Sequence, residues 1–136
     1  MKFLADTNVL SELSMPRPHP RVTRWFDSNN VDHVYFSVIT IGEIEKGLGR
    51  IDPGRRMNDL MVWFDKVQDI FKNQFLPVDK AVAREWGRLS ARESQISTTD
   101  GLIAATAIAH DLVLVTRNVG DFHFLLRPVV NPFDPA

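Results

Sequence analysis

The sequence predicts an α/β fold built on a largely parallel β-sheet. Short apolar runs alternate with segments in which apolar residues recur at helical spacing, and this alternation is typical of βαβ units. The chain has 136 residues, enough for one domain with helices on both faces of a sheet. We therefore expect residues 1–136 to form a single domain without internal repeats or linkers.

The first half of the chain is expected to contain two strands, because residues 2–6 and 34–38 are short apolar runs. A short helix is expected after the first strand, and the proline-rich stretch at residues 15–20 ends this helix. Ser37 or Thr40 is a candidate cap for the helix that follows the second strand. The helices expected here are 9–13, 21–28 and 41–50.

Helical periodicity dominates the second half of the chain. A turn at residues 52–54 precedes a segment with apolar residues at helical spacing through residues 57–71. Pro77 interrupts a short run at 75–78, which predicts an edge strand. Asp79 is expected to cap the next helix. The remaining expected elements are a helix to about residue 93, a largely apolar helix at 101–110, a strand at 112–115 and a last strand at 129–130.

Composition narrows the possible classes of site. The net charge of −1 gives no protein-wide basic field, so nucleic-acid binding would depend on local patches or on metal ions. The chain has no cysteine, which excludes disulfides, thiolate zinc sites and thiol nucleophiles. No apolar run approaches the roughly 20 residues that span a bilayer, and the N-terminal segment lacks a signal-peptide pattern. We expect a cytoplasmic protein that makes no membrane contact.

Four carboxylates stand at the ends of expected elements. Asp6 ends the first strand, and Glu43 lies in the first turn after the second. Asp100 begins the apolar helix, and Asp121 follows the strand at 112–115. Each one alone has a structural explanation, as a cap, a turn residue or a surface residue. In a parallel sheet, however, strand carboxyl ends and the starts of the following helices share one edge, which would bring the four acids together.

A shared edge would make these carboxylates repel one another. Two charges about 4 Å apart repel by about 4 kcal/mol at an effective dielectric constant of about 20. A divalent cation relieves this repulsion, and a set of oxygen ligands favours Mg²⁺ or Mn²⁺. Metal sites of this kind usually serve phosphate chemistry, in which the metal activates water and stabilises charge on the phosphate.

Basic residues are grouped in two places. One group recurs at every fourth position along the helix after Asp79, where it forms either a solvated helix face or a set of phosphate contacts. A second group lies near the proline-rich stretch. The members are Lys80, Arg84, Arg88 and Arg92 in the first group and Arg17, Arg21 and Arg24 in the second. Arg84, Arg88 and Arg17 are the candidate nucleic-acid-binding residues.

Four sequence blocks occur in order along the chain: DTNVLSEL at 6–13, SVITIGEI at 37–44, DGLIAATA at 100–107 and VTRNVGDF at 115–122. Together they resemble the PIN-domain ribonucleases, and most closely the VapC-type toxins of bacterial toxin–antitoxin pairs. The resemblance implies a three-layer α/β/α sandwich around a short, mostly parallel sheet. It also implies metal-dependent RNA hydrolysis with one or two Mg²⁺ or Mn²⁺ ions. The implied catalytic and metal-ligating residues are Asp6, Glu43, Asp100 and Asp121, supported by the polar residues Thr7, Asn8, Thr116 and Asn118.

The resemblance further implies particular partners. Such toxins form homodimers and bind a small antitoxin in an apolar groove beside the active site, and they contact DNA only through the antitoxin. The surplus of apolar residues on the 57–71 helix, and the group Val22, Trp25 and Phe26, suit these contacts as well as core packing.

Two other functions remain open. A metal-dependent phosphatase of Rossmann-like fold fits less well, because Asn8 stands where the usual second aspartate would be and no phosphate-cradling glycine loop follows the first strand. In the other alternative the acids are structural and the chain is a non-catalytic binding module. Binding of Mn²⁺ separates the enzymes from the binding module, and the choice between RNA and a phosphomonoester as substrate separates the two enzymes.

Overall fold

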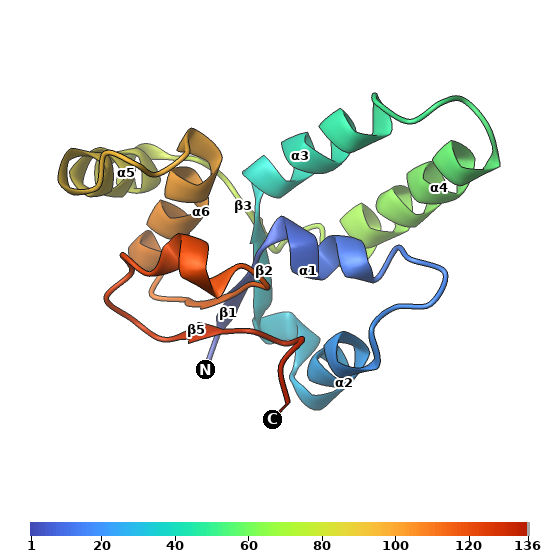
Figure 1. Ribbon diagram of the computed structural model, residues 1–136, viewed down its shortest axis with the longest axis horizontal. Coiled ribbons are helices and arrows are strands. Elements are labelled where there is room, and N and C mark those ends of the chain that lie inside the picture. Colours follow the sequence, from blue (N-terminus) through green and yellow to red (C-terminus); the bar gives the residue numbers. More distant parts are fainter. Residues whose placement is uncertain (136) are drawn as a thin grey trace.

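A five-stranded parallel sheet runs through the centre of the computed structural model, which describes residues 1–135 (Figure 1). The strands are β1 (Phe3–Ala5), β2 (Val34–Ser37), β3 (Phe75–Leu76), β4 (Val113–Val115) and β5 (Val129–Val130). Their order across the sheet is β3-β2-β1-β4-β5, and every neighbouring pair is parallel. The predicted parallel sheet is therefore confirmed, with β3 at an edge. The central strand, β1, ends at Ala5, so Asp6 emerges between the carboxyl ends of β2 and β4.

Helices connect these strands and cover both faces of the sheet. They are α1 (Thr7–Glu12), α2 (Pro20–Ser28), α3 (Val38–Leu48), α4 (Arg55–Ile70), α5 (Lys80–Arg92) and α6 (Thr98–Ala109). Two short 3₁₀ helices, η1 (Val31–His33) and η2 (Val119–Phe122), lie at segments that the sequence pattern left unassigned. Asp79 caps α5 as expected, because its Oδ1 accepts the backbone N–H of Val82 at 3.0 Å.

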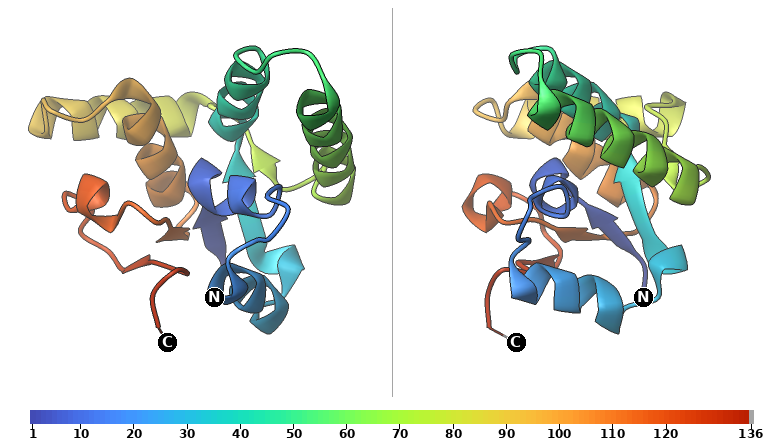
Figure 2. Two further views of the ribbon diagram at one scale, coloured as in Figure 1. Left: turned by 45° about the vertical axis from the view of Figure 1, so that its right-hand side comes forward. Right: turned by 90° about the vertical axis from the view of Figure 1, so that its right-hand side faces the viewer.

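Alternating side chains of the central strand build two separate cores. Phe3 and Ala5 pack with apolar residues of α1, α2 and α4, whereas Leu4 packs with those of α5, α6 and η2. Figures 1 and 2 show these two groups of helices on opposite sides of the sheet. The three-layer α/β/α arrangement is therefore confirmed. Val22 and Phe26 of α2 are buried in the first core, so the expected free apolar surface on this helix is absent at those two residues.

Two helices begin earlier in the chain than the sequence predicted, because side chains cap them there. The Ser37 Oγ accepts the backbone N–H of Ile39 at 3.0 Å, so α3 begins at Val38 rather than at residue 41. Glu43 consequently lies in the second turn of α3, and the expectation of a first-turn position was wrong. Similarly, an Asp6 carboxylate oxygen accepts the backbone N–H of Thr7, and α1 begins at Thr7 rather than at residue 9.

The apolar helix α6 is buried along most of its length, as expected from its composition. Its first turn carries Asp100 and is followed by Gly101, which lies directly against the Trp86 side chain of α5. Across residues 1–135, no helix has the length and hydropathy needed to cross a membrane.

Candidate active site

Asp6 is a buried carboxylate held by a defined set of donors. Its side chain sits at the amino end of α1, and the residue is only 6% exposed. One oxygen accepts the backbone N–H of Thr7 at 2.8 Å, and the other accepts the hydroxyl of Thr116 at 2.8 Å. Among the described residues, the ion pairs are Arg88–Glu85 and Arg127–Asp111, so Asp6 has no cationic side chain as a partner.

The environment of Asp6 disfavours its negative charge. Burial is the main cause, and it raises the pKa of Asp6 from 3.8 to about 6 against the lowering effect of its bonds with Thr116 and Thr7. The nearby charges of Glu43 and Asp100 raise this pKa further. A buried acid with like charges around it and no cationic neighbour is the arrangement that a bound metal ion would stabilise.

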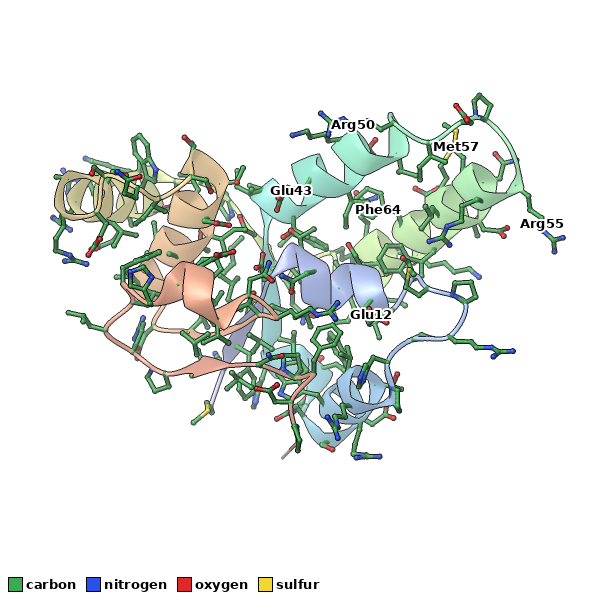
Figure 3. The ribbon with its side chains drawn as sticks, in the orientation of Figure 1. Glu12, Glu43, Arg50, Arg55, Met57 and Phe64 are labelled. Carbon is green, nitrogen blue, oxygen red and sulfur yellow. The ribbon has the colours of Figure 1, made fainter. Side chains whose placement is uncertain are left out.

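Glu43 is joined to Asp6 through two threonines. The Thr7 hydroxyl donates to Oε1 of Glu43 at 2.6 Å, and Thr7 follows Asp6 directly in the chain. The Thr40 hydroxyl lies 2.9 Å from the Thr7 hydroxyl. Because Thr7 has only one hydroxyl hydrogen, and Glu43 accepts it, Thr40 donates to Thr7. Figure 3 shows Glu43 on the first half of α3, and the Thr7 contact directs its carboxylate toward α1.

Asp100 and Asp121 form the other side of the site. Partial burial raises the pKa of Asp100, its hydrogen bond with Ser97 lowers it, and the charge of Asp121 raises it. Asp121 is exposed on η2, which packs against α6. Asp6 is therefore coupled electrostatically to Glu43 and Asp100, and Asp100 in turn to Asp121.

Residues of the loop after β4 hold the carboxylate of Asp6 in place. Besides donating to Asp6, the Thr116 hydroxyl accepts the Asn118 backbone N–H at 3.1 Å and lies 3.3 Å from the donating side-chain amide of Asn8. The Asn8 side-chain oxygen accepts the backbone N–H of Arg117 at 3.1 Å. The supporting residues Thr7, Asn8 and Thr116 are thus gathered around Asp6, whereas Asn118 joins through its backbone and has an exposed side chain.

The donor chemistry of the site fits a hard divalent cation. The four acids offer carboxylate oxygens, the ligands that Mg²⁺ and Mn²⁺ prefer, and the threonines and Asn8 are neutral. As the side chains are placed in residues 1–135, no three acidic or histidine side chains lie close enough to ligate one ion together. Ligation therefore requires rotation of side chains, for which the exposed Asp121 and the half-buried Asp100 have room.

The predicted RNA-binding arginines lie outside this cluster of contacts. Arg84 and Arg88 are exposed on α5, whose buried side packs against α6, and Arg88 pairs with Glu85 at 2.8 Å. Arg17 is exposed in the connection between α1 and α2.

Sequence reasoning did not assign a site role to Thr40, Ser97 or Arg117. Thr40 lies three positions before Glu43, so helical spacing places it on the same side of α3, and this signal was present in the sequence. Ser97 lies three positions before Asp100, which is the spacing of a helix cap. Arg117 contacts the site through its backbone N–H, which donates to Asn8. A pattern of side-chain types in the sequence cannot indicate a backbone contact of this kind.

Comparison with known proteins identifies the family of this chain. The PIN domain family model matches residues 3–123. Toxin FitB of Neisseria gonorrhoeae is 35% identical over 96% of this chain and 98% of its own length, and VapC ribonuclease Y4jK of Sinorhizobium fredii is 32% identical over 98% and 99%. The structure of a FitAB complex bound to a DNA fragment contains a chain that is 33% identical, with a TM-score of 0.89 over 98% of this chain and 97% of that one. From the family match, these similarities and the shared fold, we conclude that the chain belongs to the PIN-domain family.

Proposed function

We propose that this protein is a metal-dependent endoribonuclease, acting as a single domain, and the toxin of a type II toxin–antitoxin pair. The observation that carries the proposal is the buried Asp6 carboxylate, which has like-charged neighbours and no cationic partner in the described residues. PIN-domain ribonucleases depend on metal in general, and we propose Mg²⁺, or alternatively Mn²⁺, as the ion here.

In this proposal the residues of the site divide the work of hydrolysis. When bound, the ion neutralises charge on the phosphate and lowers the pKa of water. Asp6 and Asp100 hold the ion directly, while Glu43 and Asp121 complete the site or orient the attacking water. Water attacks the phosphorus of an RNA phosphodiester in line with the leaving 3′ oxygen, which takes up a proton. The products are a 5′-phosphate and a 3′-hydroxyl.

The supporting residues act by orienting the acids. Thr116 and the backbone N–H of Thr7 each bond one oxygen of Asp6, so its carboxylate has one fixed plane. The Thr7 hydroxyl holds the carboxylate of Glu43 in place. Asn8 bonds both the Asp6 carboxylate and the backbone N–H of Arg117, so it connects Asp6 to the loop after β4. Ligands held in this way bind an ion with little loss of conformational entropy.

Substrate binding in this proposal uses cationic side chains outside the acid cluster. Arg84, Arg88 and Arg17 are exposed and would contact phosphates of the RNA strand, each adding to the salt dependence of binding. We also propose a cytoplasmic location, which would give the enzyme access to RNA.

We propose a small antitoxin protein and a second copy of this chain as partners. A mostly apolar groove of about 260 Å³ lies between α1, α3 and α4, and Thr7 and Glu43 are among its lining residues. An antitoxin segment in this groove would cover the edge of the site. Exposed apolar residues on α4, including Met61, Val62 and Ile70, offer further contact area. Contact with DNA would come only through the antitoxin.

Cleavage by an Asp6→Asn variant tests the proposed function. Wild-type protein with Mg²⁺ is expected to cleave single-stranded RNA and to leave a phosphomonoester intact, and Asp6→Asn is expected to be inactive. Cleavage by Asp6→Asn at the wild-type rate would falsify the scheme. Hydrolysis of the phosphomonoester in place of RNA would instead indicate the phosphatase. Absence of Mn²⁺ binding in isothermal titration calorimetry would indicate the binding module.

A further inference from the structure

Arg117 is an exposed cation in the loop that follows β4. It follows Thr116, which bonds Asp6, and its own backbone N–H bonds Asn8. Among residues 1–135 the ion pairs involve two other arginines, Arg88 and Arg127, so no acid neutralises the Arg117 guanidinium. A cation at the carboxyl end of β4 is therefore available to a ligand from solvent.

The guanidinium of Arg117 is held in place by Phe133. Its central carbon lies 4.6 Å from the centre of the Phe133 ring. Phe133 is itself buried, and its carbonyl accepts a hydrogen bond of 3.2 Å from Nη1 of Arg21. His19 packs edge-to-face against the same ring, with centroids 5.4 Å apart. Stacking on an aromatic face restrains a guanidinium while leaving the N–H groups at its edge free to bind an anion.

The segment that carries Phe133 also forms one wall of a cleft. This cleft, of about 500 Å³, lies between α2 and residues 130–135, which run close to each other in Figures 1 and 2. Two of its lining residues join it to Arg117: Asn131 donates its side-chain N–H to the Arg117 carbonyl at 3.4 Å, and Arg21 anchors Phe133. Arg24, an exposed residue of α2, is a further cation in its lining, so the lining holds two cations, Arg21 and Arg24, and one acid, Asp134.

We propose that Arg117 and this cleft bind phosphates of the RNA strand that flank the cleaved bond. The inference rests on the proposed function and names the path of its substrate. Four acids in a chain of net charge −1 repel an RNA backbone, so the strand needs cations close to the acids to be held there. Arg117 holds the phosphate nearer the acids, and Arg24 holds a later one. Arginine suits this task because its planar guanidinium binds phosphate oxygens in pairs.

The test measures how RNA binding depends on salt. A fluorescein-labelled single-stranded RNA of mixed sequence is titrated at several KCl concentrations, in an Asp100→Asn background that prevents cleavage. Each phosphate contact to a single strand contributes about 0.7 to the slope of log K against log salt. Arg117→Ala and Arg24→Ala are each expected to reduce the slope by about 0.7. The matched control is Arg55→Ala, an exposed arginine at the start of α4 (Figure 3), which is expected to leave the slope unchanged.

Kinetics and a Phe133 variant complete the test. In the otherwise wild-type enzyme, Arg117→Ala is expected to raise KM more than it lowers kcat. Phe133→Leu is expected to raise KM as well, with its folding checked by the melting temperature, and Phe133→Tyr should retain the wild-type value. Unchanged slopes in both arginine variants, or an equal fall in Arg55→Ala, would overturn the inference. Neither result touches the proposed function, because cleavage by the wild-type protein tests that separately.

Discussion

The Thr7 hydroxyl donates a 2.6 Å hydrogen bond to Glu43, a residue 36 positions along the chain. Thr7 begins α1 immediately after Asp6, so this bond couples the position of Glu43 to that of the buried carboxylate. Thr40 lies within 2.9 Å of the same hydroxyl and is itself fully buried. The carboxyl ends of β1 and β2 are therefore joined by side chains as well as by the sheet.

Thr7→Val tests whether this link matters for catalysis. Valine has nearly the same shape but no hydroxyl, so Glu43 loses its donor and becomes free to turn away. We expect a 10–100-fold loss in Mn²⁺ affinity or in kcat, the usual effect of removing a residue that orients a metal ligand. Calorimetric titration and RNA cleavage measure the two quantities. Thr7→Ser, which keeps the hydroxyl, should behave like the wild type; a fully active Thr7→Val would show that Glu43 needs no such support.

Thr116→Val should destabilise the protein. The Thr116 hydroxyl is buried, donates to Asp6 and accepts the backbone N–H of Asn118, so valine removes a donor from the buried Asp6 carboxylate and an acceptor from Asn118. We expect a loss of about 1–3 kcal/mol in the free energy of unfolding, measured by urea denaturation. The pKa of Asp6 should rise further, because its bond with Thr116 lowers that pKa. Thr116→Ser is the matched control, and equal stability of the valine and serine variants would contradict this reading.

The stability of the metal-free protein should depend on the charge of Asp6. Its pKa is about 6 in the folded state against 3.8 as the ordinary value, so the folded state holds the proton more tightly. The stabilisation is fully present below pH 3.8 and is lost as the pH rises through about 6. The loss is on the order of 3 kcal/mol, since each pKa unit corresponds to about 1.4 kcal/mol. Asp6→Asn carries no such charge and should exceed the wild type in stability above pH 6.

Urea denaturation in chelator across pH 4 to 8, run on both proteins, measures this difference. Addition of Mg²⁺ should then reverse the order. An ion at about 1,000 times its Kd stabilises the wild type by about 4.1 kcal/mol, which exceeds the loss of about 3 kcal/mol, and the variant should gain less. A difference between the two metal-free proteins that stays constant over the whole pH range would argue against a raised pKa at Asp6.

Gly101→Ala should lower stability although alanine favours helices. A Cβ at Gly101 would lie 3.0 Å from Cδ1 and 3.1 Å from Nε1 of Trp86, so the indole or the first turn of α6 must shift. We expect a loss of about 1–3 kcal/mol, larger than the gain of about 1 kcal/mol in helix propensity. Cleavage should also slow, because Asp100 is the adjacent residue. In a double-mutant cycle, Trp86→Leu should recover part of the loss; if Gly101→Ala proves stabilising, the contact with Trp86 does not constrain α6.

Charge reversal on α5 tests the stripe of basic residues predicted from the sequence. Arg84→Glu with Arg88→Glu should weaken RNA binding while leaving Mn²⁺ affinity unchanged. Most of the effect should come from Arg84, because Arg88 already pairs with Glu85. RNA binding measured by anisotropy and Mn²⁺ binding measured by calorimetry separate the two properties. Parallel loss of both would mean that the reversal disturbs the fold.

Local patterns in the sequence were enough to identify most elements of the fold. The strands were predicted because they are short apolar runs, and Asp79 was predicted as a cap because aspartate favours that position; its bond with the Val82 N–H confirms the cap. The start of α3 was misplaced because Ser37 and Thr40 both suit a cap, and only the folded structure shows that Ser37 bonds the Ile39 N–H while Thr40 bonds Thr7. Asp6, Asp100 and Asp121 were proposed as site residues because each stands near the end of an element, whereas Glu43 lies in the second turn of α3.

The sequence by itself determined the fold class, the order of its elements and the acids of the candidate site, because hydrophobic periodicity and capping act over a few residues. Only the tertiary structure decided which side chains meet. The bond from Thr7 to Glu43 and the stacking of Arg117 on Phe133 depend on the strand order β3-β2-β1-β4-β5, which sets β2 and β4 on either side of β1. Such contacts join residues far apart in the chain, and no local pattern records them because their geometry exists only once the sheet has assembled.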